Sequence, residues 1–219
     1  MPYVHPRHFL DDQFPISARQ AIPTILRTAY SAARRLADEE QILQVCSAKQ
    51  NFGRLVSWSV DLGIEKAIET GVLPFDYSWE SFDKPTGKFL AVRPSHSVVT
   101  VSLTRTPTKQ PRTVVFRQQQ KQVNSQLDLL DGVTEPMEIT GLPHILLLHD
   151  YRDPEFAHLG IPRADCDQDF SYRTENLFKL PHEVEPQGPA PEGPDDAELD
   201  AVFQLKEDID RWRKENGNS

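Results

Sequence analysis

Residues 98–103, Val-Val-Thr-Val-Ser-Leu, alternate apolar and small polar side chains, and residues 89–92, Phe-Leu-Ala-Val, form a second apolar run just before them. Alternation with a period of two is typical of a β-strand that has one buried face. Pro94 and the segment from Pro107 to Pro111 separate these runs from their neighbours. The sequence therefore predicts short strands joined by turns, in a mostly antiparallel sheet.

Three further runs extend the predicted sheet. Residues 114–116 are predicted to form a short strand, and residues 156–161 a strand or a turn that packs beside the sheet. The run His-Ile-Leu-Leu-Leu at 144–148 is almost continuously apolar. Such a run is typical of a central strand that is covered on both faces.

Upstream of the strands the apolar period becomes helical. A first helix is predicted from Ile22, with Pro23 in its first turn, where the missing N–H costs nothing. A second helix is predicted over residues 55–68, with Trp58 on its apolar side and Gly71 as its left-handed stop. Gly63 lies inside this helix and costs about 1 kcal/mol relative to Ala, so the helix is expected to break there.

The domain boundaries follow from these runs. Residues 1–17 contain three prolines and show no clear period, so we expect an irregular arm. Residues 18–180 are predicted to form a single α+β domain, in which two N-terminal helices pack on the mostly antiparallel sheet.

The C-terminal end of the chain is strongly acidic. Residues 181–219 hold eleven acidic and four basic residues, a charge of −7, whereas the whole chain carries −9. Residues 181–195 are rich in proline and are expected to form a disordered acidic linker. Residues 196–216 are predicted to form a terminal amphipathic helix, whose apolar side carries Leu199, Val202, Phe203, Ile209 and Trp212.

The composition also indicates the cellular compartment of the protein. Cys46 and Cys166 are too few for a disulfide framework, so we expect a reducing compartment. No secretory signal is recognised at the start of the chain. The longest aliphatic run, residues 145–148, is far shorter than the roughly 20 residues that span a membrane. We therefore expect a cytoplasmic, bacterial protein with no membrane partner.

One basic run is a candidate contact for an anion or a nucleic acid. It has no acidic residue within it and consists of Arg105, Lys109, Arg112, Arg117 and Lys121. Residues 1–180 together carry only −2, however, whereas proteins that bind duplex DNA usually have a strongly basic face. The sequence therefore favours a solvated surface here, and nucleic acid is not the favoured partner.

The stretch from His144 to Asp169 is rich in His, Asp and Cys, which are metal-ligating residue types. His144 and His149 are five residues apart, so on one strand they point to opposite faces. No Cys-x-x-Cys or His-Glu-x-x-His pattern is present, and we predict neither a metal site nor a cofactor.

Gln126-Leu-Asp-Leu-Leu130 resembles the short peptide with which bacterial proteins bind the replication sliding clamp. The resemblance implies that Gln126 fills a polar notch of the clamp, while Leu127, Leu129 and Leu130 enter an apolar pocket. This resemblance is the basis of the alternative hypothesis, in which the chain is a DNA-processing or toxin-like protein that contacts the clamp.

A helix that carries Glu65 and Glu69 and precedes a small sheet is similar to the core of the restriction-endonuclease-like fold. In that fold, carboxylates on adjacent strands hold Mg²⁺ and a lysine supports the attacking water. The nearest match to the Glu-x-Lys motif is Gln119-Gln-Lys121, which has lost its carboxylate. If the protein is an enzyme, this resemblance implies a metal-dependent, nuclease-like hydrolase.

No acyl-transfer or phosphate-binding motif occurs in the chain. The leading hypothesis is therefore a non-enzymatic adaptor or regulatory protein that binds another protein through its acidic tail helix. The sequence leaves open whether that helix docks on a partner or folds back on its own domain.

Overall fold

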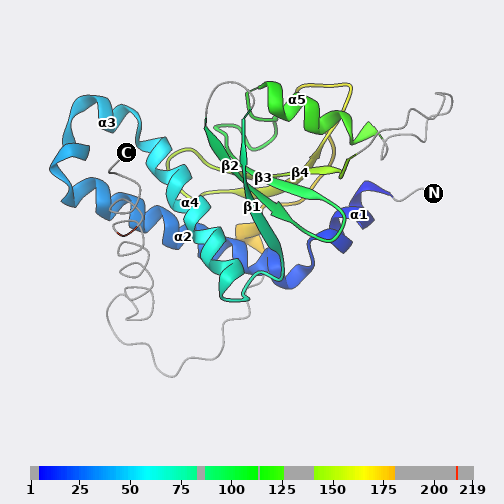
Figure 1. Ribbon diagram of the computed structural model, residues 1–219, viewed down its shortest axis with the longest axis horizontal. Helices are drawn as coiled ribbons and strands as arrows, with labels where there is room; N and C mark the ends of the chain where they lie inside the picture. Colours follow the sequence, from blue (N-terminus) through cyan, green and yellow to red (C-terminus); the bar gives the residue numbers. More distant parts are fainter. Residues whose placement is uncertain (1–4, 83–86, 113, 126–140, 181–210, 212–219) are drawn as a thin grey trace.

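The computed structural model describes residues 5–82, 87–112, 114–125 and 141–180, together with Arg211. Within these residues six strands form one sheet in the order β1-β2-β3-β4-β5-β6 (Figure 1). The strands are β1 (Asp76–Ser81), β2 (Lys88–Arg93), β3 (Val98–Leu103), β4 (His144–His149), β5 (Ala157–Pro162) and β6 (Phe170–Arg173). Neighbouring strands are antiparallel, except that β3 and β4 are parallel. The predicted α+β fold with a mostly antiparallel sheet is confirmed.

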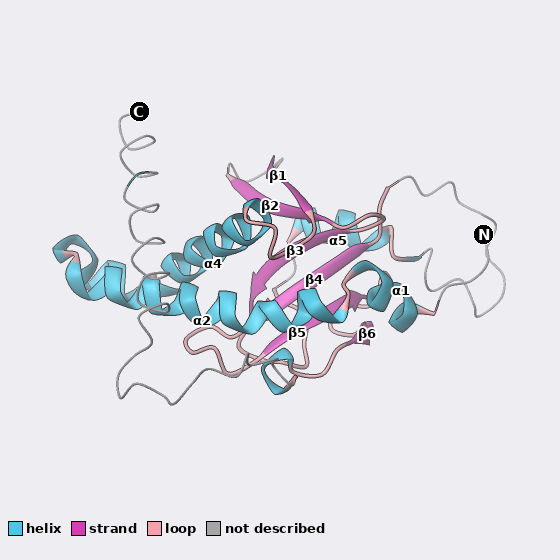
Figure 2. Cartoon of the chain, turned by 90° about the horizontal axis from the view of Figure 1, so that it is seen from below, coloured by secondary structure: helices cyan, strands magenta, loops and turns pink. Residues whose placement is uncertain are grey.

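Two long helices lie side by side across one face of this sheet (Figure 2). They are α2 (Ile16–Glu39) and α4 (Phe52–Glu69), while α5 (Val115–Gln122) lies on the opposite side of the sheet. The remaining helices are short: α1 (Pro6–Gln13), η1 (Gln41–Gln44), α3 (Cys46–Gln50) and η2 (Leu177–Lys179). No helix among the described residues is both long enough and apolar enough to cross a membrane.

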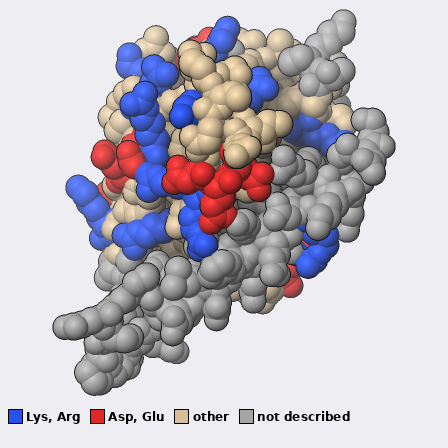
Figure 3. Space-filling view, turned by 90° about the vertical axis from the view of Figure 1, so that its left-hand side faces the viewer, with Lys and Arg blue, Asp and Glu red and all other residues tan. Residues whose placement is uncertain are grey.

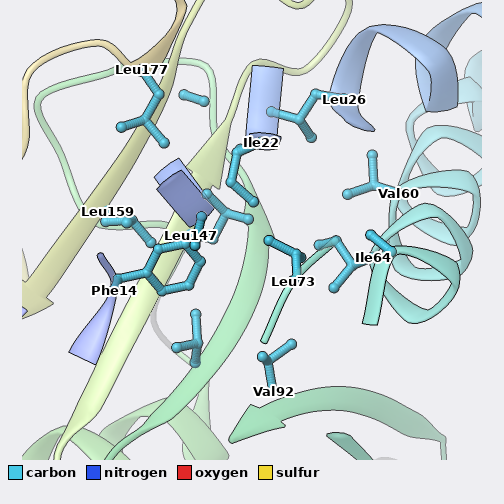
Figure 4. Packing of buried hydrophobic residues seen from close by; sticks show 14 of the residues in the cluster. Phe14, Ile22, Leu26, Val60, Ile64, Leu73, Val92, Leu147, Leu159 and Leu177 are labelled. Carbon is cyan, nitrogen blue, oxygen red and sulfur yellow. The ribbon is translucent and has the colours of Figure 1, made fainter. Parts of the chain in front are cut away.

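The main core lies between the sheet and the helices α2 and α4 (Figure 4). Every second residue of a central strand, such as Val99 and Leu147, points into this core, whereas the residues between them point to the α5 side of the sheet. The buried apolar residues labelled in Figure 4 come from both layers and from the segments that join them: Phe14, Ile22, Leu26, Val60, Ile64, Leu73, Val92, Leu147, Leu159 and Leu177.

The irregular arm expected over residues 1–17 is wrong, because α1 covers Pro6–Gln13 and α2 already begins at Ile16. Pro6 stands in the first turn of α1, and the ring nitrogen Nδ1 of His5 accepts a hydrogen bond from the Arg7 amide (3.2 Å). The buried residues of α1 are Pro6, Phe9, Leu10 and Gln13, which follow helical spacing. Burial of this short apolar side orders the segment.

The first long helix starts six residues before the predicted Ile22, so Pro23 lies inside α2 rather than in its first turn. Pro23 cannot donate to the carbonyl of Arg19, and α2 continues without that hydrogen bond.

The expected break at Gly63 is also wrong, since α4 runs from Phe52 to Glu69. A Cβ atom on Gly63 would lie 3.3 Å from Cγ2 of Ile25, so the glycine allows α2 and α4 to approach closely. Gly71 ends the turn after α4 with a φ of 77°, as predicted.

The expectation that Trp58 lies on the apolar side of its helix is wrong. Burial in α4 centres on Val56, Val60 and Ile64, which face the sheet and α2. The Trp58 side chain is 64% exposed. The apolar periodicity thus identified the helix but assigned its buried side incorrectly.

The predicted strand at 114–116 is wrong as well, because these residues lead into helix α5. A parallel pair such as β3 and β4 requires a crossover connection, which is usually helical. On the α5 side of the sheet, Phe116 stacks on Phe89 with ring centroids 4.9 Å apart. Thr100 and Ser102 are therefore buried, although their small polar side chains suggested a solvent-exposed face.

Candidate functional site

Helix α4 and strand β1 are joined by a tight turn that brings their outer side chains together. The amide of Leu73 donates to the carbonyl of Ala67 (2.9 Å), and the Leu73 side chain is buried in the main core. Strand β1 then runs back beside α4 at the edge of the sheet. The position of β1 against α4 is therefore set by Gly71 and Leu73.

Two hydrogen bonds connect β1 to α4. The hydroxyl of Tyr77 donates to Oε1 of Glu69 (3.0 Å), and Nε1 of Trp79 donates to Oε1 of Glu65 (3.2 Å). Residues two apart on a strand are about 6.7 Å apart, and residues four apart on a helix rise by about 6 Å. Because the two spacings match, both aromatic residues meet a carboxylate.

Two tryptophans are exposed on this surface. Trp79 is 42% exposed and Trp58 is 64% exposed. Trp58 precedes Glu65 by seven residues, which is close to two helical turns, so both residues lie on the same side of α4. We call this surface the aromatic–acidic face, and it comprises Trp58, Asp61, Glu65, Glu69, Tyr77 and Trp79.

Asp61 is the electrostatically unusual group of the aromatic–acidic face. Burial, and next the negative charge of Glu65, raise the pKa of Asp61 from 3.8 to about 7. No hydrogen bond or ion pair connects Asp61 to any of the described residues. A half-buried carboxylate without a donor is costly when ionised. A cation placed beside Asp61 and Glu65 would remove that cost.

The cation nearest in sequence, Lys66, already has a carboxylate partner. Its Nζ lies 3.0 Å from Oε2 of Glu69. This contact and the Tyr77 hydroxyl lower the pKa of Glu69 below its ordinary value. Asp61 and Glu65 form no ion pair within the described part of the chain, so the aromatic–acidic face carries excess negative charge.

The structure separates the residues of the basic run. Arg105 lies over the ring of Tyr151, 4.9 Å from its centroid, whereas Lys121 is buried and pairs with Asp167. Burial lowers the pKa of Arg117 to about 10, and its Nη1 donates to the carbonyl of Arg112 (2.7 Å). Lys109 and Arg112 remain exposed. These five residues do not form one continuous basic surface.

Charges are also mixed at the end of the molecule that carries α3. Figure 3 shows acidic and basic side chains interleaved there, without a large area of one sign. The ion pairs Arg34–Asp153 and Arg35–Glu39 belong to this region. The described part of this surface does not have the continuous basic stripe that is typical of proteins that bind a nucleic-acid backbone.

Three histidines of the 144–169 stretch are buried and hydrogen-bonded. Nε2 of His144 lies 2.8 Å from Oγ1 of Thr100, and Nδ1 of His149 lies 2.7 Å from the hydroxyl of Tyr30 on α2. His144 and His149 thus point to opposite faces of the sheet, as predicted. Nδ1 of His158 lies 2.9 Å from the carbonyl of Thr174. Burial lowers the pKa of His144 to about 3 and that of His149 to about 4.

The acidic loop that follows β5 lines a cleft of about 610 Å³ beside α5. Its charged groups are largely paired, since Arg163 binds Asp165 (2.7 Å) and Lys121 binds Asp167. Among the described residues, no group of three or more His, Cys, Asp and Glu is arranged to hold a metal ion.

Gln119-Gln-Lys121 lies on helix α5, not on a strand as the nuclease resemblance requires. The strand positions that face α4, such as Leu90 and Val101, are apolar. Glu65 and Glu69 instead accept hydrogen bonds from Trp79 and Tyr77.

Two predicted binding segments fall outside the described residues. They are the clamp-binding motif Gln126–Leu130 and the apolar side of the tail helix, Leu199, Val202, Phe203, Ile209 and Trp212. Both remain predictions from the sequence.

Most residues of the aromatic–acidic face were not predicted from the sequence. Strand β1 was not predicted, although Tyr77 and Trp79 alternate with polar residues in Asp-Tyr-Ser-Trp-Glu-Ser. The polar neighbours of Trp58 on its own side of α4, Asp61 and Glu65, were the available sign that this side is exposed.

A comparison with protein-family models gives no match for this chain, and neither a curated protein nor a solved structure matches it.

Proposed function

We propose that this protein acts by binding another protein, as an adaptor or regulator, through the aromatic–acidic face and the acidic C-terminal segment. The observation that carries the proposal is the exposure of Trp58 and Trp79 on the aromatic–acidic face. Tryptophan is strongly enriched among the residues that dominate protein–protein binding energies.

The apolar surface of the two tryptophans is large enough to matter. A tryptophan side chain buries about 150–250 Å² when it is fully enclosed. The exposed fractions of 64% and 42% then leave roughly 200 Å² accessible on Trp58 and Trp79 together. Complete burial of that area contributes about 5 kcal/mol, at about 25 cal/mol per Å². A partner that covers both indoles would gain a substantial part of its affinity from them.

The C-terminal segment is the second element of the proposal. Its charge of −7 attracts a basic partner over a distance, and the predicted apolar side with Phe203 and Trp212 adds short-range contacts. The segment and the aromatic–acidic face carry charge of the same sign. One basic partner can therefore engage both of them.

Affinity capture with matched variants tests the proposal. The bait proteins are the full-length chain, Trp58→Ala/Trp79→Ala, a chain lacking residues 182–219, and Val115→Ala as the control. Val115 is 59% exposed on α5, on the other side of the sheet, so its truncation removes exposed apolar surface elsewhere. We expect one set of proteins to be captured by the full-length and Val115→Ala chains and lost from the double tryptophan variant. Equal capture by all four chains would contradict the proposal.

The clamp alternative depends on Gln126–Leu130 alone. Binding of purified sliding clamp to the full-length chain, abolished by Leu129→Ala/Leu130→Ala, would establish it. Absence of clamp binding to the full-length chain would remove it.

A further inference from the structure

We propose that the aromatic–acidic face is a docking site for a cationic protein segment, with a Lys or Arg side chain seated against the indole of Trp79 and the carboxylates of Asp61 and Glu65. This inference rests on the proposed function and specifies the chemistry of the partner.

The carboxylates of Asp61 and Glu65 can accept a cation. Glu65 accepts a hydrogen bond from Nε1 of Trp79, and neither Glu65 nor Asp61 has a cationic partner among the described residues. Asp61 has no donor among them either, although it is half-buried. Removing part of a carboxylate from water is costly unless the group is paired or hydrogen-bonded. The described residues therefore leave a position at which an external cation is favourable.

The indole of Trp79 lies beside the carboxylate of Glu65. The 3.2 Å hydrogen bond places the Glu65 carboxylate at the edge of the Trp79 ring, whose Nε1 is occupied. Part of the indole is accessible, because Trp79 is 42% exposed. A cation within about 6 Å of an indole centroid is attracted by the ring, and tryptophan is the best of the aromatic residues for this contact. One cation can thus contact the indole and a carboxylate together.

The charges disfavour other occupants of the aromatic–acidic face. Residues 181–219 carry −7, the same sign as the carboxylate of Glu65, so this chain's own acidic tail is a less favourable occupant than a basic segment. A second copy of the aromatic–acidic face would present the same negative charges. Nucleic-acid phosphates are repelled for the same reason. A basic protein segment is the occupant that the charges and the indoles accept together.

Indole NMR signals locate a bound cation directly. The chain has three tryptophans, Trp58, Trp79 and Trp212, so the full-length protein gives three indole N–H signals. They are assigned with single Trp→Phe variants. The probes are a ten-residue lysine peptide and a ten-residue glutamate peptide. We expect the lysine peptide to shift the Trp58 and Trp79 signals saturably, and the glutamate peptide to shift neither.

Charge variants provide the second readout. At pH 8, where Asp61 is ionised, Asp61→Asn/Glu65→Gln keeps an acceptor for Trp79 but removes both charges. We expect its affinity for the lysine peptide at the face to fall about tenfold, equivalent to about 1.4 kcal/mol. Glu175→Gln, at an exposed carboxylate elsewhere, should bind as the wild type does. A titration that shifts only Trp212, or an unchanged affinity in the double charge variant, would overturn the inference.

The experiments distinguish a failure of the proposed protein-binding function from a failure of the proposed cationic partner. If the double tryptophan variant loses its captured proteins while the lysine peptide leaves Trp58 and Trp79 unshifted, protein binding stands and the cationic partner is wrong. If the lysine peptide binds as expected but all four baits capture the same proteins, the proposed function is wrong.

Discussion

The most informative single substitution is Asp61→Asn, because it removes one charge and changes little in shape. Burial and Glu65 raise the pKa of Asp61 from 3.8 to about 7. The folded protein therefore holds the Asp61 proton up to about pH 7, whereas the unfolded chain releases it near pH 4. Between these values the folded state binds more protons than the unfolded state, so stability falls as the pH rises through this window.

The magnitude follows from the size of the shift. One pKa unit corresponds to about 1.4 kcal/mol, so a shift from 3.8 to about 7 sets an upper limit of about 4 kcal/mol. Asp61 is only half-buried and keeps some contact with water, which reduces the expected loss to about 2 kcal/mol. The amide that replaces the carboxyl group carries no charge at any pH. We therefore expect Asp61→Asn to be about 2 kcal/mol more stable than the wild type at pH 8 and nearly equal to it at pH 4.5.

Urea unfolding followed by far-ultraviolet circular dichroism at pH 4.5, 6 and 8 measures this difference. The buried histidines titrate in both proteins, so their contributions cancel when the wild type is subtracted from the variant. Glu175→Gln serves as the control and should show no such trend. A stability difference between Asp61→Asn and the wild type that is zero, or that does not change with pH, would refute the account of the Asp61 environment.

Three further changes test the fold. Gly160→Ala would place a Cβ 2.7 Å from Cδ1 of Phe170, and we expect the free energy of unfolding in urea to fall by about 1–3 kcal/mol. Asn124→Ala removes the buried amide that donates to the carbonyls of His144 (3.0 Å) and Pro162 (2.8 Å), and calorimetry should show a loss of about 2–4 kcal/mol. Burial lowers the pKa of His144 to about 3 and of His149 to about 4, so the stability of Asp61→Asn, which lacks the opposing contribution of Asp61, should fall as the pH drops from 6.5 to 4; stability of this variant that rises steadily over this range would contradict the burial of the histidines.

The central strands were predictable because their local pattern and their tertiary environment agree. Residues 145–148 are continuously apolar and lie in β4, whose residues are all buried. The alternation over 98–103 predicted β3 correctly, and Val99 does face the main core. In β4 and on the core-facing side of β3, burial follows from the local sequence, whereas the burial of Thr100 and Ser102 on the other side of β3 does not.

The elements that were predicted incorrectly depend on contacts with residues that are distant in the sequence. Residues 114–116 have β-branched and aromatic side chains, yet they enter α5, since the parallel pairing of β3 with β4 requires a crossover. The sequence of neither strand indicates that β3 and β4 pair in parallel. In α1 the buried spacing of Pro6, Phe9 and Leu10 was readable, but the prolines around it masked the helical period.

The aromatic–acidic face was not predictable for a similar reason. Trp58 lies in a helix that was predicted, but its exposure follows from how α4 is rotated against α2 and the sheet. The contacts of Tyr77 and Trp79 with Glu69 and Glu65 need the turn at Gly71 to return the chain beside α4. Such long-range placement becomes visible only in three dimensions.

Site-specific photo-crosslinking in the cells that naturally contain the protein shows whether a basic partner lies on the aromatic–acidic face. Benzoylphenylalanine replaces Trp58, Trp79 or, as the control, Val115 on the opposite side of the sheet. We expect positions 58 and 79 to crosslink to the same partner through a Lys- or Arg-rich segment, and position 115 not to. Crosslinks to that partner from position 115 alone, or an acidic segment at positions 58 and 79, would contradict this expectation.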